Sequence, residues 1–334
     1  MTTFAVFGIV RDGYGNIFHH LKKELRESSD WHFLDMCVNG THATPQEREW
    51  HIDDTAVVLC LPDWLPDVYA PKIISFCMFE STRLPGDWAE HLNYIAERVI
   101  VPCEWNVETF RANGVTVPIS VCPLGIDPIE YAPISRNGSH EGKPYTFLWS
   151  GTPDARKGFD IVYPAFWKAF KGDPSAQLVM HFRKYPKGLM GTTDANVRVI
   201  QGKYMPAVMN KILAEADCFV FPSRGEGWGL PPREAAATGL PVIVTRYGGL
   251  AEGIDYWAMP LEQVGRSAAH YGAWGDEDLG EWAEPNIDEL AEKMRWCFEN
   301  QKSAANFGEN AATWLKNNQS WAQTATRLKQ IVEP

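Results

Sequence analysis

One stretch constrains the fold of this chain more than any other: Cys218 to Thr245, CFVFPSRGEGWGLPPREAAATGLPVIVT. It begins with an apolar, aromatic run, 218–221, which is typical of a buried strand. A glycine-rich loop follows, and then two prolines, which suit a first helical turn because their missing N–H would have no partner there. Gly239 ends the predicted helix, and the apolar residues after it are typical of the next strand. The stretch therefore predicts a β-loop-α-β unit.

Two glutamates stand in this unit, Glu226 on the loop and Glu234 in the first predicted helical turn. Glu226 comes just after the carboxyl end of a strand, where open α/β sheets bind their ligands. We expect Glu234 to face the same crevice. Each glutamate by itself is better explained as a loop carboxylate or a helix-capping acid, since acidic residues favour a first helical turn. The glycines around Glu226 leave room for backbone N–H groups to approach a bound anion or sugar.

Apolar runs of strand length alternate with helical segments along the whole chain. This alternation predicts parallel, doubly wound sheets, and a length of 334 residues favours two domains over one. The polar stretch 136–144 has no apolar periodicity and is typical of a domain linker. We therefore predict an α/β protein with a Rossmann-like N-terminal domain, 1–135, and a second such domain, 145–310.

Composition narrows the class of protein further. The net charge is −11, from 31 lysines and arginines against 42 aspartates and glutamates, which argues against a general polyanion binder. No segment of the sequence is long and apolar enough to span a bilayer, and Met1–Val10 has no basic region typical of a signal peptide. The seven cysteines include no C-x-x-C pair, so they indicate reduced core residues rather than disulfides or a zinc site. These features predict a cytoplasmic protein.

Two further loops precede predicted helices and are suited to an anion. Gly13 and Gly15 follow an apolar run and come before an amphipathic segment, so their N–H groups can meet a phosphate. A plain tight turn is the alternative there. Arg156 and Lys157 stand just before another predicted helix, where the positive end of the helix dipole disfavours cations unless an anion binds between them. The alternative is a pair of solvated side chains.

Charged residues also mark two loops whose role stays open. Glu80 and Arg83 follow the strand predicted at 72–78, where a carboxylate and a guanidinium can position a hydroxyl group. An exposed ion pair explains them equally well. The basic run 183–187 is by default a solvated surface, and it is also the best local candidate for contact with an anionic substrate.

The pattern E-G-W-G-L-P-P-x-E, followed by A-x-A-x-G-x-P-V-I, resembles the E-x7-E signature of the retaining GT-B glycosyltransferases of family 4. The resemblance implies two doubly wound domains that face one another across a cleft, with C-terminal helices, 311–334, that cross back onto the N-terminal domain. It implies transfer of a sugar from a nucleotide-diphosphate sugar to a hydroxyl acceptor, with retention of configuration and with neither a metal nor another cofactor. A sugar-nucleotide epimerase or phosphorylase of similar architecture is the alternative of another class.

The same resemblance assigns roles to residues around the donor. Glu226, Arg156 and Lys157 are the implied catalytic residues. The two cations hold the departing diphosphate and stabilise its charge, and Glu226 holds the sugar ring and its developing charge. The remaining implied donor contacts are Gly13 and Gly15 for the diphosphate, Glu226, Gly227, Trp228, Gly229 and Leu230 for the sugar, Glu234 for the ribose, and Tyr204 and Met205 for the nucleobase.

On the acceptor side, the resemblance leaves Glu80 as the nearest candidate for a catalytic, acceptor-orienting residue, with Arg83 beside it. Because the chain is acidic, we expect a glycan or small-molecule acceptor. Hydroxymethylated bases in DNA are the alternative, which would require a flipped nucleotide and many phosphate contacts. The run Asp276–Asp278 matches the D-x-D metal motif of the other major glycosyltransferase fold, but no apolar strand precedes it. It therefore predicts a solvated acidic turn, and we expect no metal site.

Overall fold

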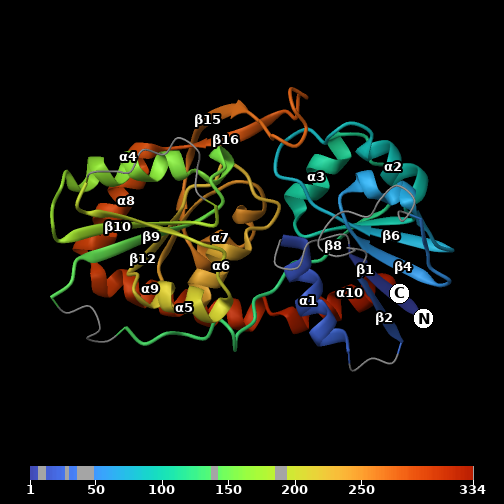
Figure 1. The fold of residues 1–334 in the computed structure, drawn as a ribbon, viewed down its shortest axis with the longest axis horizontal. Coiled ribbons are helices and arrows are strands. Elements are labelled where there is room, and N and C mark those ends of the chain that lie inside the picture. Colours follow the sequence, from blue (N-terminus) through green and yellow to red (C-terminus); the bar gives the residue numbers. More distant parts are fainter. Residues whose placement is uncertain (7–12, 27–29, 36–48, 137–141, 185–193, 334) are drawn as a thin grey trace. The chain divides into compact units, whose positions relative to one another are not determined.

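The protein forms two compact α/β units in a computed structural model, which describes residues 1–6, 13–26, 30–35, 49–136, 142–184 and 194–333 (Figure 1). Unit 1 contains Met1–Gly125, His270–Gly280 and Gln319–Pro334. Unit 2 contains Ile126–Ala269 and Glu281–Asn318. The α/β class with two doubly wound, Rossmann-like units, predicted from the alternation of apolar runs, is thereby confirmed.

Unit 1 is built on a six-stranded parallel sheet with the strand order β2-β1-β4-β6-β7-β8. The strands of this sheet are β1 (Thr2–Val6), β2 (Trp31–Asp35), β4 (Thr55–Leu59), β6 (Lys72–Phe76), β7 (Arg98–Val101) and β8 (Ile119–Val121). A short parallel pair and the helices complete the unit: β3 (Trp50–His51), β5 (Val68–Tyr69), α1 (Gly13–Leu25), η2 (Pro62–Asp67), α2 (Trp88–Ile95), α3 (Glu104–Ala112) and α10 (Trp321–Val332).

Unit 2 is built on a second six-stranded parallel sheet with the order β11-β10-β9-β12-β13-β14. The strands of this sheet are β9 (Tyr145–Gly151), β10 (Ala176–Phe182), β11 (Val197–Gln201), β12 (Cys218–Phe221), β13 (Val242–Thr245) and β14 (Met259–Leu261). The remaining elements are η3 (Ala155–Lys157), α4 (Phe159–Phe170), α5 (Pro206–Ala214), α6 (Leu230–Ala237), η4 (Gly248–Ala251), α7 (Ile254–Trp257), β15 (Gln263–Ala268), β16 (Glu281–Pro285), α8 (Ile287–Glu299) and α9 (Gln301–Asn318).

The strand order places a topological switch point in each sheet. In unit 2, β9 is the first strand of the sheet, with β10 on one side and β12 on the other. Loops that leave neighbouring strands in opposite directions at such a point open a crevice at the carboxyl ends of the strands. Arg156 and Lys157 follow β9, and Glu226 follows β12. The two predicted donor-binding segments of unit 2 therefore flank its switch point.

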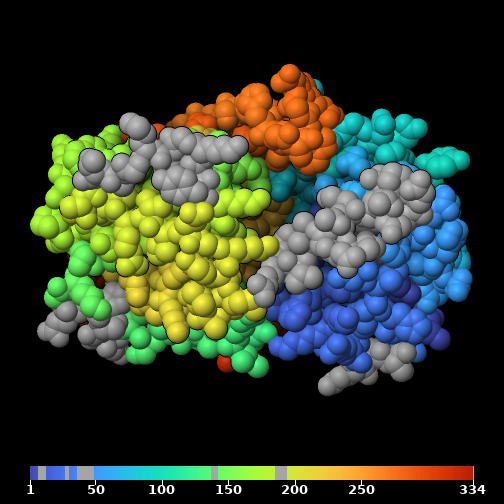
Figure 2. Space-filling model, viewed as in Figure 1, coloured from blue at the N-terminus to red at the C-terminus, as the bar shows by residue number. Residues whose placement is uncertain are grey.

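Helices cover both faces of the unit 2 sheet, which explains why its central strands are continuous apolar runs. Figure 1 shows α4 and α8 on one side of β9 and β10, with α5 and α9 on the other side. All four residues of β12 and all four of β13 are buried, as expected for parallel strands with two covered faces. Figure 2 shows the segment containing α5, in yellow, at the surface of unit 2, and Leu213 is the buried residue of that helix.

Two helices begin earlier than the sequence predicted. α1 starts at Gly13, so the two glycines of the expected loop lie in the first helical turn. α6 starts at Leu230 and contains both prolines, which places Glu234 after the first turn rather than in it. The reason is that proline is accepted at the first helical positions, and Gly229, at φ 88°, supplies the left-handed residue that ends the loop.

The boundaries between the two units also differ from the domain boundaries that the sequence predicted. Unit 2 begins at Ile126, ahead of the expected linker 136–144, of which 137–141 lie outside the described residues. Ile126 and Tyr131 belong to the hydrophobic core of unit 2, and the Arg136 guanidinium donates to backbone carbonyls of the same unit. The C-terminal helix α10 lies in unit 1 and packs with α1.

The antiparallel pair β15–β16 was not predicted from the sequence. Its strands belong to unit 2, whereas the connecting residues 270–280 belong to unit 1. We refer to residues 270–280 as the tip. Its Tyr271 and Trp274 rings pack against Phe79, with ring centroids 5.2 and 5.7 Å apart. Among the described residues, no helix is long and apolar enough to cross a membrane.

Candidate active site

The Glu226 carboxylate lies at the centre of a buried charged cluster in unit 2. Lys157 Nζ donates to Glu226 Oε1 and Oε2 at 2.6 and 2.8 Å. Arg156 Nη1 lies 3.2 Å from Oε1, and the Ser223 hydroxyl donates to the same oxygen at 2.8 Å. The Glu226 side chain is 7% exposed, so these contacts take place almost out of water. The sequence predicted all three ionic residues for the site, and the fold brings them together.

Local backbone structure holds the two cations in place. They lie in η3, whose N-cap Asp154 accepts from the Arg156 N–H. Gly158 follows with φ 70°, and a Cβ there would lie 2.0 Å from the Pro222 carbonyl oxygen, so only glycine fits. The Arg156 carbonyl in turn accepts from the Arg224 backbone N–H at 2.7 Å. The loop after β9 and the loop after β12 are therefore joined by both backbone and side chains.

The electrostatics of the cluster keep Glu226 ionised. Burial by itself would raise the pKa of Glu226, but the charges of Lys157 and then Arg156 hold the pKa below its ordinary value. A bound diphosphate would be a second anion beside the same two cations. The positive charges of the cluster can therefore stabilise an anionic leaving group such as a diphosphate, beside the Glu226 carboxylate.

Glu234 lies in α6 in a different environment. Burial raises the pKa of Glu234 to about 7; Arg183 lowers it, Glu130 raises it, and a hydrogen bond with Tyr131 lowers it. Glu234 is half-buried, whereas Tyr131 is 8% exposed. Glu226 and Glu234 therefore differ in charge near neutral pH: Glu226 is an ionised, paired carboxylate, whereas Glu234 is partly protonated.

Trp228, one of the loop residues that the resemblance assigned to the donor sugar, is buried inside unit 2. Trp228 is 2% exposed, and its ring lies against the Arg233 guanidinium, 4.0 Å from Cζ to the ring centroid. Its side chain is thus committed to packing against Arg233. Sequence reasoning placed Trp228 on the loop but did not anticipate its contact with Arg233.

The residues predicted to border the nucleobase follow β11. The Tyr204 ring stacks on His181, with centroids 5.2 Å apart, and its hydroxyl donates to the Gln201 carbonyl at 2.7 Å. His181 is joined to Ser150 Oγ through Nδ1 at 2.8 Å. Met205 is 47% exposed at the N-cap of α5. One face of Tyr204 is therefore occupied by the protein, and Met205 is accessible.

In unit 1, the structure brings together the predicted phosphate segment and the predicted acceptor residue. Tyr14 stands between Gly13 and Gly15 at the start of α1. Burial raises the pKa of Tyr14, and the nearby Cys77 thiol and Glu80 carboxylate raise it further. Glu80 thus lies near the first turn of α1, at the carboxyl ends of the strands.

Arg83 is engaged differently from its expected role. Its guanidinium pairs with Asp278 of the tip, and its N–H donates to the Leu279 carbonyl at 3.2 Å. Glu277 accepts from the Gly86 N–H. Glu277 and Asp278, which we expected in a solvated turn, therefore contact the loop after β6. The sequence did not predict this contact, because the two segments are far apart in the chain.

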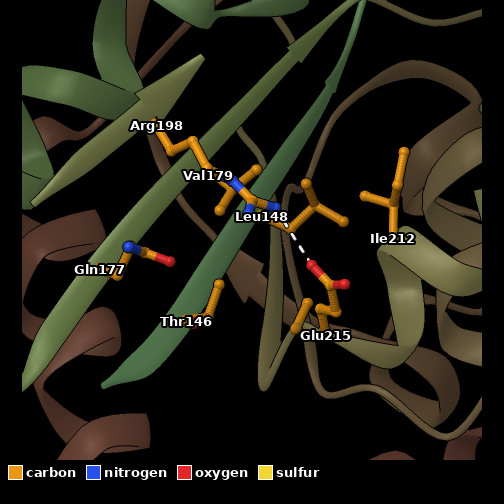
Figure 3. A pocket seen from close by; sticks show the side chains of 8 residues that line it. Thr146, Leu148, Gln177, Val179, Arg198, Ile212 and Glu215 are labelled. Atoms are coloured by element: carbon orange, nitrogen blue, oxygen red, sulfur yellow. Dashed lines mark hydrogen bonds and ion pairs between the residues drawn. The ribbon is translucent and has the colours of Figure 1, made fainter. Parts of the chain in front are cut away.

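A small cavity of about 20 Å³ lies elsewhere in unit 2, between the sheet and α5 (Figure 3). Figure 3 shows side chains of β9, β10 and β11 pointing toward Ile212, with Arg198 Nη2 donating to Glu215 at 3.1 Å across the opening. That volume suits about one water molecule. Its lining includes neither Glu226 nor Lys157, so the cavity is separate from the charged cluster.

Three contact residues of the site were missed from the sequence: Ser223, Tyr131 and Arg233. Ser223 and Arg233 lie within the stretch 218–245, but no feature of the sequence marked either residue as part of the site. Tyr131 is far from Glu234 in the chain, and no local pattern links the two. Their roles follow from spatial contact alone.

Comparison with solved structures identifies the architecture. Sucrose-phosphate synthase from Thermosynechococcus elongatus superposes with a TM-score of 0.73 at 14% identity, covering 99% of this chain and 98% of the other. Anabaena Alr3699/HepE in complex with UDP-glucose gives a TM-score of 0.72 at 12% identity, covering 99% of both chains. At these identities the likeness shows the fold, which is that of GT-B glycosyltransferases.

Sequence comparison identifies relatives and the family. Mannosylfructose-phosphate synthase of Agrobacterium fabrum is 26% identical over 183 residues, which are 48% of this chain and 38% of that protein. The chain thus spans less than half the length of this curated relative. The model of the family described as Family 4 Glycosyltransferase in conflict systems matches residues 109–328. Because that match covers more than half of the chain, this protein belongs to the family 4 glycosyltransferases in conflict systems.

Proposed function

We propose that this protein transfers a sugar from a nucleotide-diphosphate sugar to a hydroxyl group, with retention of configuration and without a metal ion. The observation that supports the proposal most directly is the buried contact of Glu226 with Lys157 and Arg156 beside the switch point of unit 2. Two cations held in place by protein contacts suit a leaving diphosphate, because preorganised charges cost no reorganisation during the reaction.

The proposed roles follow from these contacts. Arg156 and Lys157 hold the diphosphate as the bond from the sugar C1 to its oxygen breaks and the electron pair leaves with the diphosphate. The acceptor oxygen bonds C1 on the same face, and its proton goes to the departing phosphate oxygen. Glu226 and the N–H groups of the following loop bind the sugar ring, and Glu234 accepts from the ribose hydroxyls. The acceptor we propose is a carbohydrate or small molecule.

The first test is donor binding. A relative in fold was solved with UDP-glucose, so UDP-, GDP- and ADP-glucose form the starting panel for calorimetry. Glu234→Gln should weaken binding of the best donor by about 1.5–3 kcal/mol, typical of hydrogen bonds to a charged group. Lys168→Ala is the matched control, because Lys168 pairs with Asp288 at an exposed site. Equal affinity in the Glu234 variant and the wild type would remove that residue from the site.

The second test separates transfer from other sugar-nucleotide chemistry. Release of nucleoside diphosphate should depend on an added acceptor, and the product should keep the donor's anomeric configuration by NMR. An epimerase would change the sugar without releasing diphosphate, and a phosphorylase would require inorganic phosphate. Lys157→Ala should lower kcat roughly a hundredfold, the scale of one lost preorganised donor.

The third test concerns metal independence. We expect turnover to continue in EDTA, because Arg156 and Lys157 already supply positive charge for the diphosphate. If chelation abolishes turnover and manganese or magnesium restores it, the proposal of a metal-free reaction is wrong.

A further inference from the structure

Arg233, directly before Glu234 in the chain, carries a fully buried guanidinium, at 0% exposure. Its Cζ lies 4.0 Å from the centroid of Trp228 and 4.4 Å from that of Trp257. Such cation–π contacts strengthen when the cation is desolvated. Burying a guanidinium is nevertheless costly unless its donors are satisfied, so its hydrogen bonds indicate what the position does.

Those hydrogen bonds join two separate backbone segments. Nη1 donates to the carbonyls of Trp228 and Gly229, in the loop that follows Glu226. Nη2 donates to the carbonyls of Gly249 and Glu252 at 2.9 and 3.2 Å, in the turn after β13. We refer to residues 226–229 as the sugar loop and to 248–252 as the glycine turn. The planar fork of arginine allows one side chain to bond both, which the single ammonium of lysine does not.

The sugar loop and the glycine turn touch directly where Arg233 ties them. The Gly249 N–H donates to the Glu226 carbonyl at 2.8 Å. A Cβ at Gly248 would lie 2.7 Å from the Glu226 carbonyl oxygen, and one at Gly249 would lie 2.3 Å from that of Gly227. The two backbones therefore approach as closely as glycine permits, at the backbone of Glu226 and Gly227.

We propose that Arg233 is a positioning residue that fixes the sugar loop against the glycine turn and thereby sets the geometry of the sugar-binding N–H groups. The inference rests on the proposed function of the Glu226 site. A displacement of the order of 1 Å in a positioning group costs about a hundredfold in rate, and removing Arg233 frees both carbonyl pairs. The diphosphate cations Arg156 and Lys157 stand on another loop, so nucleotide binding should be little affected.

The experiment compares Arg233→Met with the wild type, using UDP, GDP and ADP as probes for binding and their glucose esters for turnover. We expect kcat to fall about 10- to 100-fold, whereas the Kd for the bound nucleoside diphosphate changes less than about threefold. Arg233→Lys should resemble Arg233→Met, because it keeps the charge but loses the fork. Leu290→Ala is the control for stability, since Leu290 is fully buried in α8, outside these loops.

The outcomes distinguish the inference from a merely structural role and from the proposed function. If Arg233→Met lowers the melting temperature as Leu290→Ala does but keeps wild-type kcat per folded molecule, Arg233 only stabilises the fold. If nucleoside diphosphate affinity falls as much as kcat, the effect spreads through the site and the inference is also wrong. Should Arg233→Met fail to fold, Arg233→Lys answers the same question. A wild type that binds and turns over no donor would overturn the proposed function and this inference with it.

Discussion

The Lys157 ammonium lies within hydrogen-bonding distance of both oxygens of Glu226, at 2.6 and 2.8 Å. Both side chains are largely buried, at 16% and 7% exposure. The residue proposed to hold the diphosphate therefore contacts the residue proposed to hold the sugar directly. Donor binding at this place must share Lys157 between a carboxylate and a phosphate, so the pair links stability to function.

We expect Lys157→Met to destabilise unit 2, because it leaves the buried Glu226 carboxylate without its nearest cation. Arg156 and Ser223 still bond Glu226, so the loss should lie near the lower end of the about 3–5 kcal/mol for breaking a buried pair. Adding Glu226→Gln should restore part of it, since the double variant has no orphaned carboxylate. Urea denaturation measures both.

The control for this cycle is Lys168→Met, which removes an exposed pair with Asp288 and should change stability by less than about 1 kcal/mol. Equal stabilities of the single and the double variant at Lys157 would show that the orphaned Glu226 carboxylate is not the cause of the loss.

We expect Glu234 to lower stability as pH rises from about 4.5 to about 7, since the pKa of Glu234 is raised from 4.5 to about 7, first by burial. In that window the folded protein binds more protons than the unfolded chain, so the free energy of unfolding falls, by at most about 1.4 kcal/mol per pH unit. Above pH 7 the loss is complete. The stability of Glu234→Gln relative to the wild type should therefore increase between pH 5 and 8 in urea denaturation.

Asp173→Asn provides the comparison for this titration. The pKa of Asp173 is held below its ordinary value of 3.8, first by a hydrogen bond from the Ser175 side chain. Its stabilising effect is present above pH 3.8 and is lost only at lower pH, so this variant should show no trend between pH 5 and 8. A flat difference for Glu234→Gln as well would contradict the raised pKa of Glu234.

Arg83 and Asp278 should hold the tip on the loop after β6. Arg83→Glu places two acids opposite one another, so chymotrypsin should cut at Tyr271 or Trp274 several-fold faster, through easier local opening. The charge-swapped double variant Arg83→Glu with Asp278→Arg should return to the wild-type rate. Arg198→Glu, which breaks an exposed pair with Glu215, is the control. Protection that is unchanged in Arg83→Glu would mean that the aromatic contacts alone anchor the tip.

The acceptor is tested by offering labelled donor to a glycan panel and to hydroxymethylated duplex DNA, at low and at physiological salt. We expect label on a carbohydrate or small molecule, because the chain has 31 basic residues and 42 acidic ones. The tip also places the acidic side chains of Glu277 and Asp278 beside the loop that contains Glu80. Phosphate contacts make DNA binding fall steeply with salt. Label on the DNA that declines in this way would favour the DNA alternative.

The sequence by itself determined the class of fold and the main ionic residues of the site. Strand-length apolar runs such as 218–221 depend on local periodicity, and glycine and proline act through their own backbone preferences, so both are visible without a structure. Glu226, Lys157 and Arg156 stand on loops that follow strands, and parallel strands bring such loops to one edge of the sheet. The proximity of these three residues was therefore predictable from the order of strands and loops along the chain.

Only the tertiary structure decided which side chains pair. Tyr131 with Glu234, and Arg83 with Asp278, join residues far apart in the chain, and such contacts depend on packing that no local pattern encodes. Arg233 shows the same limit inside a recognised motif: as sequence it is a charged residue on a short helix, typically solvent-exposed. The fold instead places it between two tryptophans, because backbone carbonyls of two loops and two aromatic faces converge on that helix. Burial and partners, not residue type, assign its role.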